Sequence, residues 1–207
     1  MTKSKSAVEK IGIFGGTFSP PHIGHVNSAK DFLREIQLDE LFVIPTYQPP
    51  HKEYGAEASA DERLEMTRLA FSGVPKASVS DLEIMRGGMS YTYLTLEELS
   101  REDREIFLLC GTDMLLTLSE WKNAERIFEL ATICYVRREN DAQLKNEIER
   151  RIAEYRERYG ARVITVSNAV VEISSTELRK MLKERSGAEK YLPRAVYEYI
   201  LEKGLYL

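Results

Sequence analysis

Two histidines and a pair of glycines stand close together near the start of the sequence. Residues 13–25 read IFGGTFSPPHIGH, so an apolar segment leads through Gly15 and Gly16 and a proline-containing loop to His22 and His25. Glycines have no Cβ and let backbone N–H groups approach an anion, and a helix N-terminus adds unsatisfied donors. Residues three apart share a helix face, so both imidazoles can reach one ligand. This pattern predicts a phosphate-binding site; the alternative is a structural turn whose histidines cap local backbone groups.

A second candidate anion site lies in the last fifth of the chain. Residues 173–179 read ISSTELR. Ser174, Ser175 and Thr176 are typical helix N-cap residues, and Arg179 adds a permanently charged group that matches phosphate. Hydroxyl groups and free N–H groups at a helix start predict a second phosphate contact. Alone, the motif is also a common way to begin a helix.

The segments that must position these residues alternate between short apolar runs and longer periodic stretches. The apolar runs predict strands at residues 10–14, 40–45, 77–82, 105–110, 131–136 and 162–167. The periodic stretches predict helices at residues 26–36, 59–72, 93–99, 121–130, 140–159, 175–185 and 193–203. Ser59 and Glu62 predict a capping box at the start of the second helix.

Successive strand–helix units predict an α/β fold of the Rossmann-like, doubly wound type, with a mainly parallel sheet and helices on both faces. Ligands in such folds bind beyond the carboxyl ends of the strands. That rule selects the stretches after Phe14, Pro45, Cys110 and Val136. The candidate motifs fall at these places, and the long loop at residues 46–58 is a candidate lid over substrate.

The composition is that of an ordinary soluble globular protein. The 207 residues include 29 Lys and Arg against 33 Asp and Glu, a formal net charge of −4. This balance argues against a general nucleic-acid binder. No apolar run approaches the ~18 residues of a membrane span, and residues 1–10 lack a signal-peptide core, so we expect no membrane association.

The two cysteines indicate the cellular compartment in which the protein is expected. Cys110 and Cys134 each close an apolar run, without CxxC spacing or a metal-binding cluster around them. We expect two buried small hydrophobic residues in a reducing compartment, and hence a cytoplasmic protein. A disulfide or a catalytic thiol is the alternative.

The first motif closely resembles the GGTFDPPHxGH signature of the nucleotidyltransferases, and in detail that of the bacterial nicotinate-nucleotide adenylyltransferases. ISSTELR resembles the ISSTxIR motif of the same superfamily, and the likeness runs from Ile11 to Tyr206. It implies one nucleotidyltransferase domain over residues 1–207, with the helical part at about 173–207 completing the ATP site. It also implies adenylyl transfer from ATP to nicotinate mononucleotide, giving deamido-NAD and diphosphate in NAD biosynthesis, with Mg²⁺ on the phosphate oxygens.

The resemblance also implies roles for individual residues, each at the position matching a family motif. The residues with implied catalytic roles are His22, His25, Lys52 and Arg179. Those with implied ATP-binding roles also include Phe14, Gly15, Gly16, Thr17, His51, Gly111, Asp113, Arg138, Ser174, Ser175 and Thr176. Those with implied acceptor-binding roles are Ser90, Tyr91, Thr92, Trp121 and Lys122. No protein side chain is assigned as a metal ligand.

Purely structural interpretations also fit several of these residues. The PPHK segment that ends with Lys52 also fits an exposed loop, Asp113 fits an N-cap, and Trp121 fits a buried core position. Four positions depart from the family pattern. Leu178 replaces the Ile of ISSTxIR, which is a mild change. Ser19 replaces an Asp, Lys122 stands where the family often has Tyr, and Arg138 is followed by Glu-Asn rather than Pro-Gly.

Other functions stay open from the sequence alone. Nicotinamide mononucleotide or phosphopantetheine are alternative acceptors, a non-catalytic nucleotide-binding protein is a different class, and a structural α/β scaffold is a third. Small-molecule substrates are the expected partners, and a homo-oligomer is compatible with the sequence.

Overall fold

The computed structural model describes residues 8–50, 58–136, 144–167 and 173–207. The strands in this part are β1 (Glu9–Gly16), β2 (Glu40–Pro45), β3 (Ala77–Val79), β4 (Arg104–Gly111), β5 (Ala131–Val136) and β6 (Val163–Val166). The helices are α1 (Ile23–Ile36), α2 (Ala60–Phe71), α3 (Leu82–Arg86), α4 (Thr92–Leu99), α5 (Thr112–Thr117), α6 (Ala124–Leu130), α7 (Lys145–Tyr159), α8 (Ser175–Lys183) and α9 (Arg194–Lys203). Short 3₁₀ turns are η1 (Leu118–Glu120) and η3 (Ala188–Tyr191).

The strands form one sheet in the order β3-β2-β1-β4-β5-β6, and every neighbouring pair is parallel. The chain starts in the middle of the sheet, runs outward to β3, returns to the middle at β4 and runs to the other edge. The strand order therefore reverses between β1 and β4, which is the expected place for a ligand. The predicted doubly wound α/β fold is confirmed.

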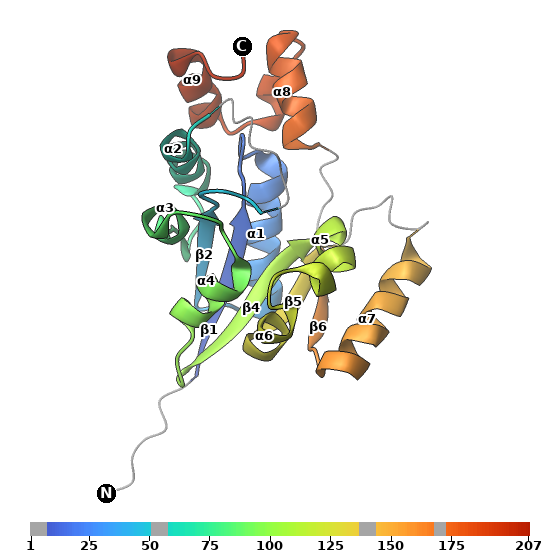
Figure 1. Ribbon diagram of the computed structural model, residues 1–207. Coiled ribbons are helices and arrows are strands. Elements are labelled where there is room, and N and C mark those ends of the chain that lie inside the picture. Colours follow the sequence, from blue (N-terminus) through green and yellow to red (C-terminus); the bar gives the residue numbers. More distant parts are fainter. Residues whose placement is uncertain (1–7, 51–57, 137–143, 168–172) are drawn as a thin grey trace, which may run out of the picture.

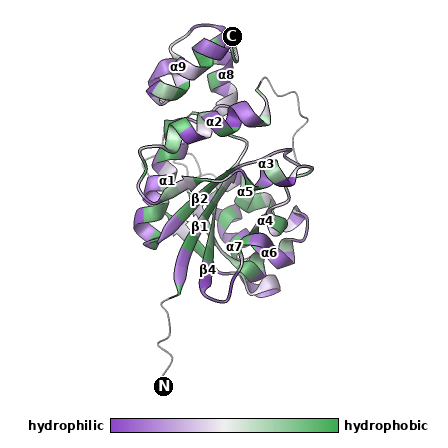
Figure 2. Cartoon of the chain, turned by 90° about the vertical axis from the view of Figure 1, so that its left-hand side faces the viewer, coloured by the Kyte–Doolittle hydropathy of each residue, from purple (hydrophilic) through white to green (hydrophobic). Residues whose placement is uncertain are grey.

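Helices cover both faces of the sheet, and each face has its own core. In β4, Phe107 and Leu109 join the cluster that includes α1, α2, α8 and α9, whereas Leu108 joins the cluster of α4 to α7. This alternation follows from the two-residue period of a strand that is buried on both sides. Figure 2 shows the apolar strands between helices. Figure 1 shows α8 and α9 beyond the carboxyl ends of the strands.

One glycine in β1 sets how closely α1 approaches the sheet. A Cβ on Gly12 would lie 2.5 Å from Leu38 Cδ1 and 2.8 Å from Phe32 Cε1. These distances are far below van der Waals contact, so a side chain at this position would require the neighbouring side chains to shift. The glycine thus allows close packing of α1, which begins between His22 as its N-cap residue and His25 in its first turn.

Several predicted elements differ in extent from the observed ones. Residues 77–82 were expected to form one strand, but β3 ends at Val79 and Leu82 begins α3. The expected helix at 121–130 begins only at Ala124, because Trp121 ends the η1 turn. Helix α5, directly after β4, was not predicted. Of the long expected helix at 140–159, residues 140–143 lie outside the described part.

Both cysteines are buried and free. Cys110 belongs to one core cluster and Cys134 to the other, so the two thiols lie on opposite faces of the sheet. Burial raises the pKa of both thiols, that of Cys134 to about 12. The expectation of two buried small hydrophobic residues is confirmed. None of the helices in the described ranges is long and apolar enough to span a bilayer.

Candidate functional site

A cavity of about 700 Å³ lies at the carboxyl ends of the strands, where the strand order reverses. Its wall brings together residues from β1, the loop after β2, β4, the α4 region and the start of α8. The sequence-predicted residues on this wall are Phe14, Gly15, Gly16, Thr17, His22, His25, Ser90, Tyr91, Thr92, Gly111, Asp113, Trp121, Lys122, Ser174, Ser175, Thr176 and Arg179. His51, Lys52 and Arg138 lie outside the described residues.

The two histidine rings lie against one another at the start of α1. His22 is the N-cap residue and is buried, and His25 is the third residue of the helix. Their ring centroids are 3.7 Å apart, with the planes tilted by 32°. Two residues three apart thus lie side by side, as their spacing predicts, while the expectation that both rings reach one ligand stays a prediction.

A hydrogen bond fixes which nitrogen of His25 carries the proton. The backbone N–H of His22 donates to Nδ1 of His25 at 3.2 Å. A nitrogen that accepts a hydrogen bond carries no proton, so the neutral ring bears its hydrogen on Nε2. The ring edge of Phe18 lies against His25, with centroids 5.1 Å apart. His25 is therefore held as an Nε2–H donor beside the cavity.

The start of α8 is tied to the loop that precedes α1. Arg179 donates from Nη1 to the carbonyl of Ser19 at 2.8 Å, and the Ser175 hydroxyl donates to the carbonyl of Pro20 at 3.0 Å. These contacts join residues about 155 positions apart. The two predicted anion-binding motifs therefore lie side by side on one cavity.

Helix α8 begins with a complete capping box. The backbone N–H of Glu177 donates to the Ser174 hydroxyl at 3.1 Å, and the Glu177 carboxylate accepts from the N–H of Ser174 at 2.8 Å. The side chain of Arg179 reaches back toward the helix start and donates from Nη2 to Thr176 Oγ1 at 3.2 Å. The positive end of the helix dipole lies at the cavity wall, next to this guanidinium group.

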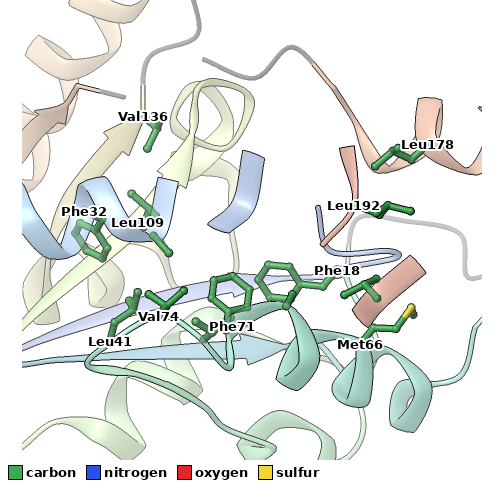
Figure 3. Packing of buried hydrophobic residues seen from close by; sticks show 14 of the residues in the cluster. Phe18, Phe32, Leu41, Met66, Phe71, Val74, Leu109, Val136, Leu178 and Leu192 are labelled. Carbon is green, nitrogen blue, oxygen red and sulfur yellow. The ribbon is translucent and has the colours of Figure 1, made fainter. Parts of the chain in front are cut away.

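The two glycines after β1 do different work. A Cβ on Gly15 would meet no atom within 4 Å, so its backbone borders open space. A Cβ on Gly16 would lie 2.9 Å from the Phe18 ring. The absence of a side chain at Gly16 thus makes room for the Phe18 ring, which packs on His25. Both glycines were expected to leave room for a ligand, and the space around Gly15 alone agrees with that expectation. Figure 3 shows Phe18 next to Phe71, on the side of the core where Leu178 and Leu192 lie.

A single tryptophan lies at the other end of the cavity. Trp121 is half-buried rather than part of the core, and its Nε1–H donates to Thr117 Oγ1 at 3.4 Å. Lys122 follows it and is exposed. Trp121 packs against the edge of the core cluster of α4 to α7, but it also lines the cavity and borders an outer groove with Arg158, so it is not a fully buried core residue.

The end of β4 leads directly into α5 at the cavity. Gly111 is the N-cap residue of α5, and Asp113 lies in the first turn of that helix with its side chain exposed. Asp113 is therefore not the N-cap that the alternative interpretation supposed. A carboxylate in a first helical turn is favoured by the helix dipole and stays available to a ligand hydroxyl.

The chain was compared with known proteins. A family model described as cytidylyltransferase-like matches residues 13–181. A probable nicotinate-nucleotide adenylyltransferase of Desulfatibacillum aliphaticivorans is 36% identical over 96% of this chain and 100% of its own length. One from Clostridium botulinum (strain Kyoto / Type A2) is 35% identical over 94% of this chain and 97% of its own. This chain belongs to the nicotinate-nucleotide adenylyltransferase family.

Solved structures agree with this family at the level of the fold. The nicotinic acid mononucleotide adenylyltransferase of Plasmodium falciparum, complexed with NaAD, superposes with a TM-score of 0.77 at 19% identity. The match covers 96% of this chain and 97% of that one. A putative nicotinate-nucleotide adenylyltransferase of Vibrio parahaemolyticus superposes with a TM-score of 0.65 at 22% identity, over 96% and 95% of the two chains.

One departure from the nicotinate-nucleotide adenylyltransferase motif has a structural counterpart. Ser19, which stands where the motif has Asp, shares a hydrogen bond of 2.9 Å between its buried hydroxyl and that of Tyr206. Tyr206, near the end of the chain, is therefore bound to the loop at residues 17–22, which leads to His22. The expectation that the local turn survives without the carboxylate is consistent with this contact.

Sequence reasoning missed two buried charged residues of this nicotinate-nucleotide adenylyltransferase. Arg63 of α2 is fully buried and donates to the carbonyls of Thr17 at 2.8 Å and Tyr47 at 3.1 Å. Glu83 of α3 is also buried and lines the cavity. Arg63 lies on the charged side of a helix pattern, and Glu83 lies directly after the strand expected at residues 77–82, so neither residue carried a motif signal.

Proposed function

We propose that this protein transfers the adenylyl group of ATP to nicotinate mononucleotide and releases diphosphate, forming deamido-NAD. The observation that carries the proposal is the junction of the histidine loop with the start of α8. Arg179 and Ser175 bind the carbonyls of residues 19 and 20, so donors from both motifs border one cavity. A cavity of about 700 Å³ is within the usual range for a small-molecule site.

In this proposal the triphosphate lies between the two motifs. His22, His25 and Arg179 would stabilise charge on the phosphate oxygens, helped by the N-terminal ends of α1 and α8. The His25 Nε2–H fixed by the hydrogen bond to Nδ1 supplies a neutral, preoriented donor. The remaining described residues assigned to ATP are Phe14, Gly15, Gly16, Thr17, Gly111, Asp113, Ser174, Ser175 and Thr176. The roles of His51, Lys52 and Arg138 in binding ATP rest on the family motif alone.

The acceptor would lie at the Trp121 end. Its pyridine ring would stack on the half-buried indole, and backbone N–H groups of Thr92 and Lys122 would meet the ring carboxylate. Ser90 and Tyr91 lead into the first turn of α4. The first N–H groups of a helix have no carbonyl partner within the helix, so they can bind a ligand. A carboxylate acceptor at a helix N-terminus also agrees with the direction of the helix dipole.

The chemistry needs alignment and charge neutralisation rather than a general base. The 5′-phosphate of nicotinate mononucleotide is already an anion, and it attacks the α-phosphorus as the bond to diphosphate breaks. The described residues hold no group of three potential metal ligands, and Asp113 is a carboxylate on the cavity wall. Such a wall fits Mg²⁺ held mainly by ATP and water, where the ion would neutralise charge on the leaving diphosphate.

Three further expectations stay predictions. The chain is expected to fold as one domain whose part at about 173–207 completes the ATP site, and the contacts of α8 with residues 19 and 20 support this. The cytoplasmic location and a homo-oligomeric state rest on the sequence alone.

The test is steady-state turnover with ATP and each of three acceptors, followed by diphosphate release. We expect kcat/KM for nicotinate mononucleotide to exceed that for nicotinamide mononucleotide and for phosphopantetheine by at least tenfold. A preference for the amide would contradict the acceptor assignment. Binding of ATP without diphosphate release under any of these conditions would favour a non-catalytic nucleotide-binding protein.

A further inference from the structure

The acceptor end of the cavity contains a buried carboxyl group to which no family motif assigns a role. Glu83 of α3 lines the cavity together with Ser90, Thr92 and Thr95, and its side chain is only 6% exposed. Its Oε2 atom has no hydrogen-bond partner within residues 8–50, 58–136, 144–167 and 173–207. A buried carboxyl oxygen without a donor costs free energy, so stability alone does not account for an acid at this position.

The other oxygen of Glu83 joins a compact network. Thr95 Oγ1 donates to Glu83 Oε1 at 2.6 Å, and Arg86 Nη2 donates to the same Thr95 oxygen at 2.9 Å. The guanidinium group also lies 3.8 Å from Oε1, and its Nη1 pairs with the exposed Glu98 at 3.2 Å. Burial raises the pKa of Glu83, while hydrogen bonds from Thr95 and Ser90 and the charge of Arg86 oppose that rise.

This network fixes the segment that leads into α4. Thr95 lies one turn into α4, so its hydrogen bond to Glu83 ties this helix to α3. Ser90, which also lines the cavity, accepts the backbone N–H of Tyr47 at 2.9 Å, and its own N–H donates to the carbonyl of Gln48. Glu83 thus holds α4 through Thr95, directly after the segment at residues 90–92.

We propose that Glu83 is a positioning residue for the acceptor: through Thr95 it holds α4 so that the N–H groups of the first turn of that helix face the ring carboxylate of nicotinate mononucleotide. The inference rests on the proposed function, because that function assigns carboxylate binding to this turn. It predicts different effects on the binding of the two substrates. Loss of the network weakens binding of the acceptor at the Trp121 end and leaves ATP, bound between the histidines and α8, unaffected.

Two matched pairs of variants test this. Glu83→Gln removes the charge and keeps one acceptor oxygen, and Glu98→Gln removes the other carboxylate partner of Arg86 at an exposed site. Thr95→Val deletes the hydroxyl that binds Glu83, and Thr95→Ser retains it. We measure KM for each substrate, kcat, the Kd of nicotinate mononucleotide by calorimetry, and the unfolding transition.

We expect Glu83→Gln and Thr95→Val to raise KM and Kd for nicotinate mononucleotide about tenfold, with KM for ATP within twofold of wild type. Thr95→Ser and Glu98→Gln should stay within twofold for both substrates. If Glu83→Gln does not fold, the Thr95 pair decides. Unchanged Kd in Thr95→Val, equal changes in both KM values, or the same loss in Glu98→Gln would overturn the inference.

The assay separates this inference from the proposed function. A wild-type protein that binds nicotinate mononucleotide but forms no deamido-NAD contradicts the function, while the Kd series still decides the role of Glu83. A wild-type protein that does not bind nicotinate mononucleotide contradicts both. An active wild type whose Kd is unchanged in both Glu83→Gln and Thr95→Val contradicts the role of Glu83 alone.

Discussion

At the scale of single residues, short hydrogen bonds decide what each polar group at the cavity can do. His25 is the clearest case, because the N–H of His22 occupies Nδ1 and leaves Nε2–H as the donor. A neutral imidazole donor needs no proton to be lost or gained during adenylyl transfer. Preoriented donors of this kind stabilise a charged transition state more than a flexible side chain would.

Replacing His25 by alanine should lower turnover by on the order of 10²–10³, the usual effect of losing one preoriented donor. Lys30→Ala is the control, because Lys30 is exposed on the same helix. Steady-state kinetics with saturating substrates measures the effect. A His25→Ala variant that keeps more than half of the wild-type turnover would remove His25 from the mechanism.

The pKa of Glu83 predicts how stability depends on pH. Burial raises this pKa above the ordinary value of 4.5, so the folded protein binds the proton more tightly than the unfolded chain does. The contribution of Glu83 to the free energy of unfolding is therefore complete below pH 4.5 and falls as the pH rises through the raised pKa. The difference between wild type and Glu83→Gln in urea unfolding should shrink or reverse from pH 4 to pH 8. A difference that grows with pH would contradict the raised pKa.

At the scale of elements, the sequence predicted apolar strands and longer helices well, and helices of five or six residues poorly. β2 and β5 agree with the expected ranges at both ends, and α1 carries the expected apolar face. The elements that the sequence did not predict are short. α3 and α5 have five and six residues, too few for a helical period to be read, and a 3₁₀ turn precedes α6. Because Glu83 and Asp113 lie on those two short helices, the surroundings of both acids were not predictable.

Two capping boxes of the same kind allow an effect on stability to be distinguished from an effect on substrate binding. Ser59 and Glu62 begin α2, and Ser174 and Glu177 begin α8, with closely similar distances. Ser59→Ala and Ser174→Ala should each cost about 1 kcal/mol of stability, the typical value for an N-cap hydroxyl. Only Ser174 lines the cavity. Thermal unfolding and KM for ATP are measured for both variants, and we expect KM for ATP to rise only in Ser174→Ala. A raised KM in Ser59→Ala, or an unchanged KM in Ser174→Ala, would contradict the role of Ser174 in binding ATP.

At the scale of the whole molecule, the site is assembled from both ends of the chain. The order of the strands and the contact of α8 with residues 19 and 20 cannot be derived from periodicity, because they depend on how separate elements pack. The family motifs implied this meeting, and the topology explains it. β1 is central, and α8 and α9 share a core with α1 and α2. The segments at 51–57, 137–143 and 168–172 lie outside the described residues, and predictions for them rest on sequence.

The hydroxyl pair of Ser19 and Tyr206 tests this assembly. Each hydroxyl is buried against the other at 2.9 Å, so removing either one leaves its partner without that bond. Ser19→Ala and Tyr206→Phe should each cost about 1 kcal/mol, and the double variant should cost less than their sum by a similar amount. Urea unfolding of the four proteins gives the coupling. Additive losses would show that the end of the chain does not support the histidine loop.

The central claim is that both motifs act on one triphosphate and direct attack to its α-phosphorus. It is tested by incubating the protein and nicotinate mononucleotide with ATP labelled with ³²P at either the α or the γ position. The α label should appear in deamido-NAD and the γ label in diphosphate, in equal amounts. Label from the γ position in a nicotinate nucleotide product, or release of orthophosphate without a dinucleotide, would contradict the account.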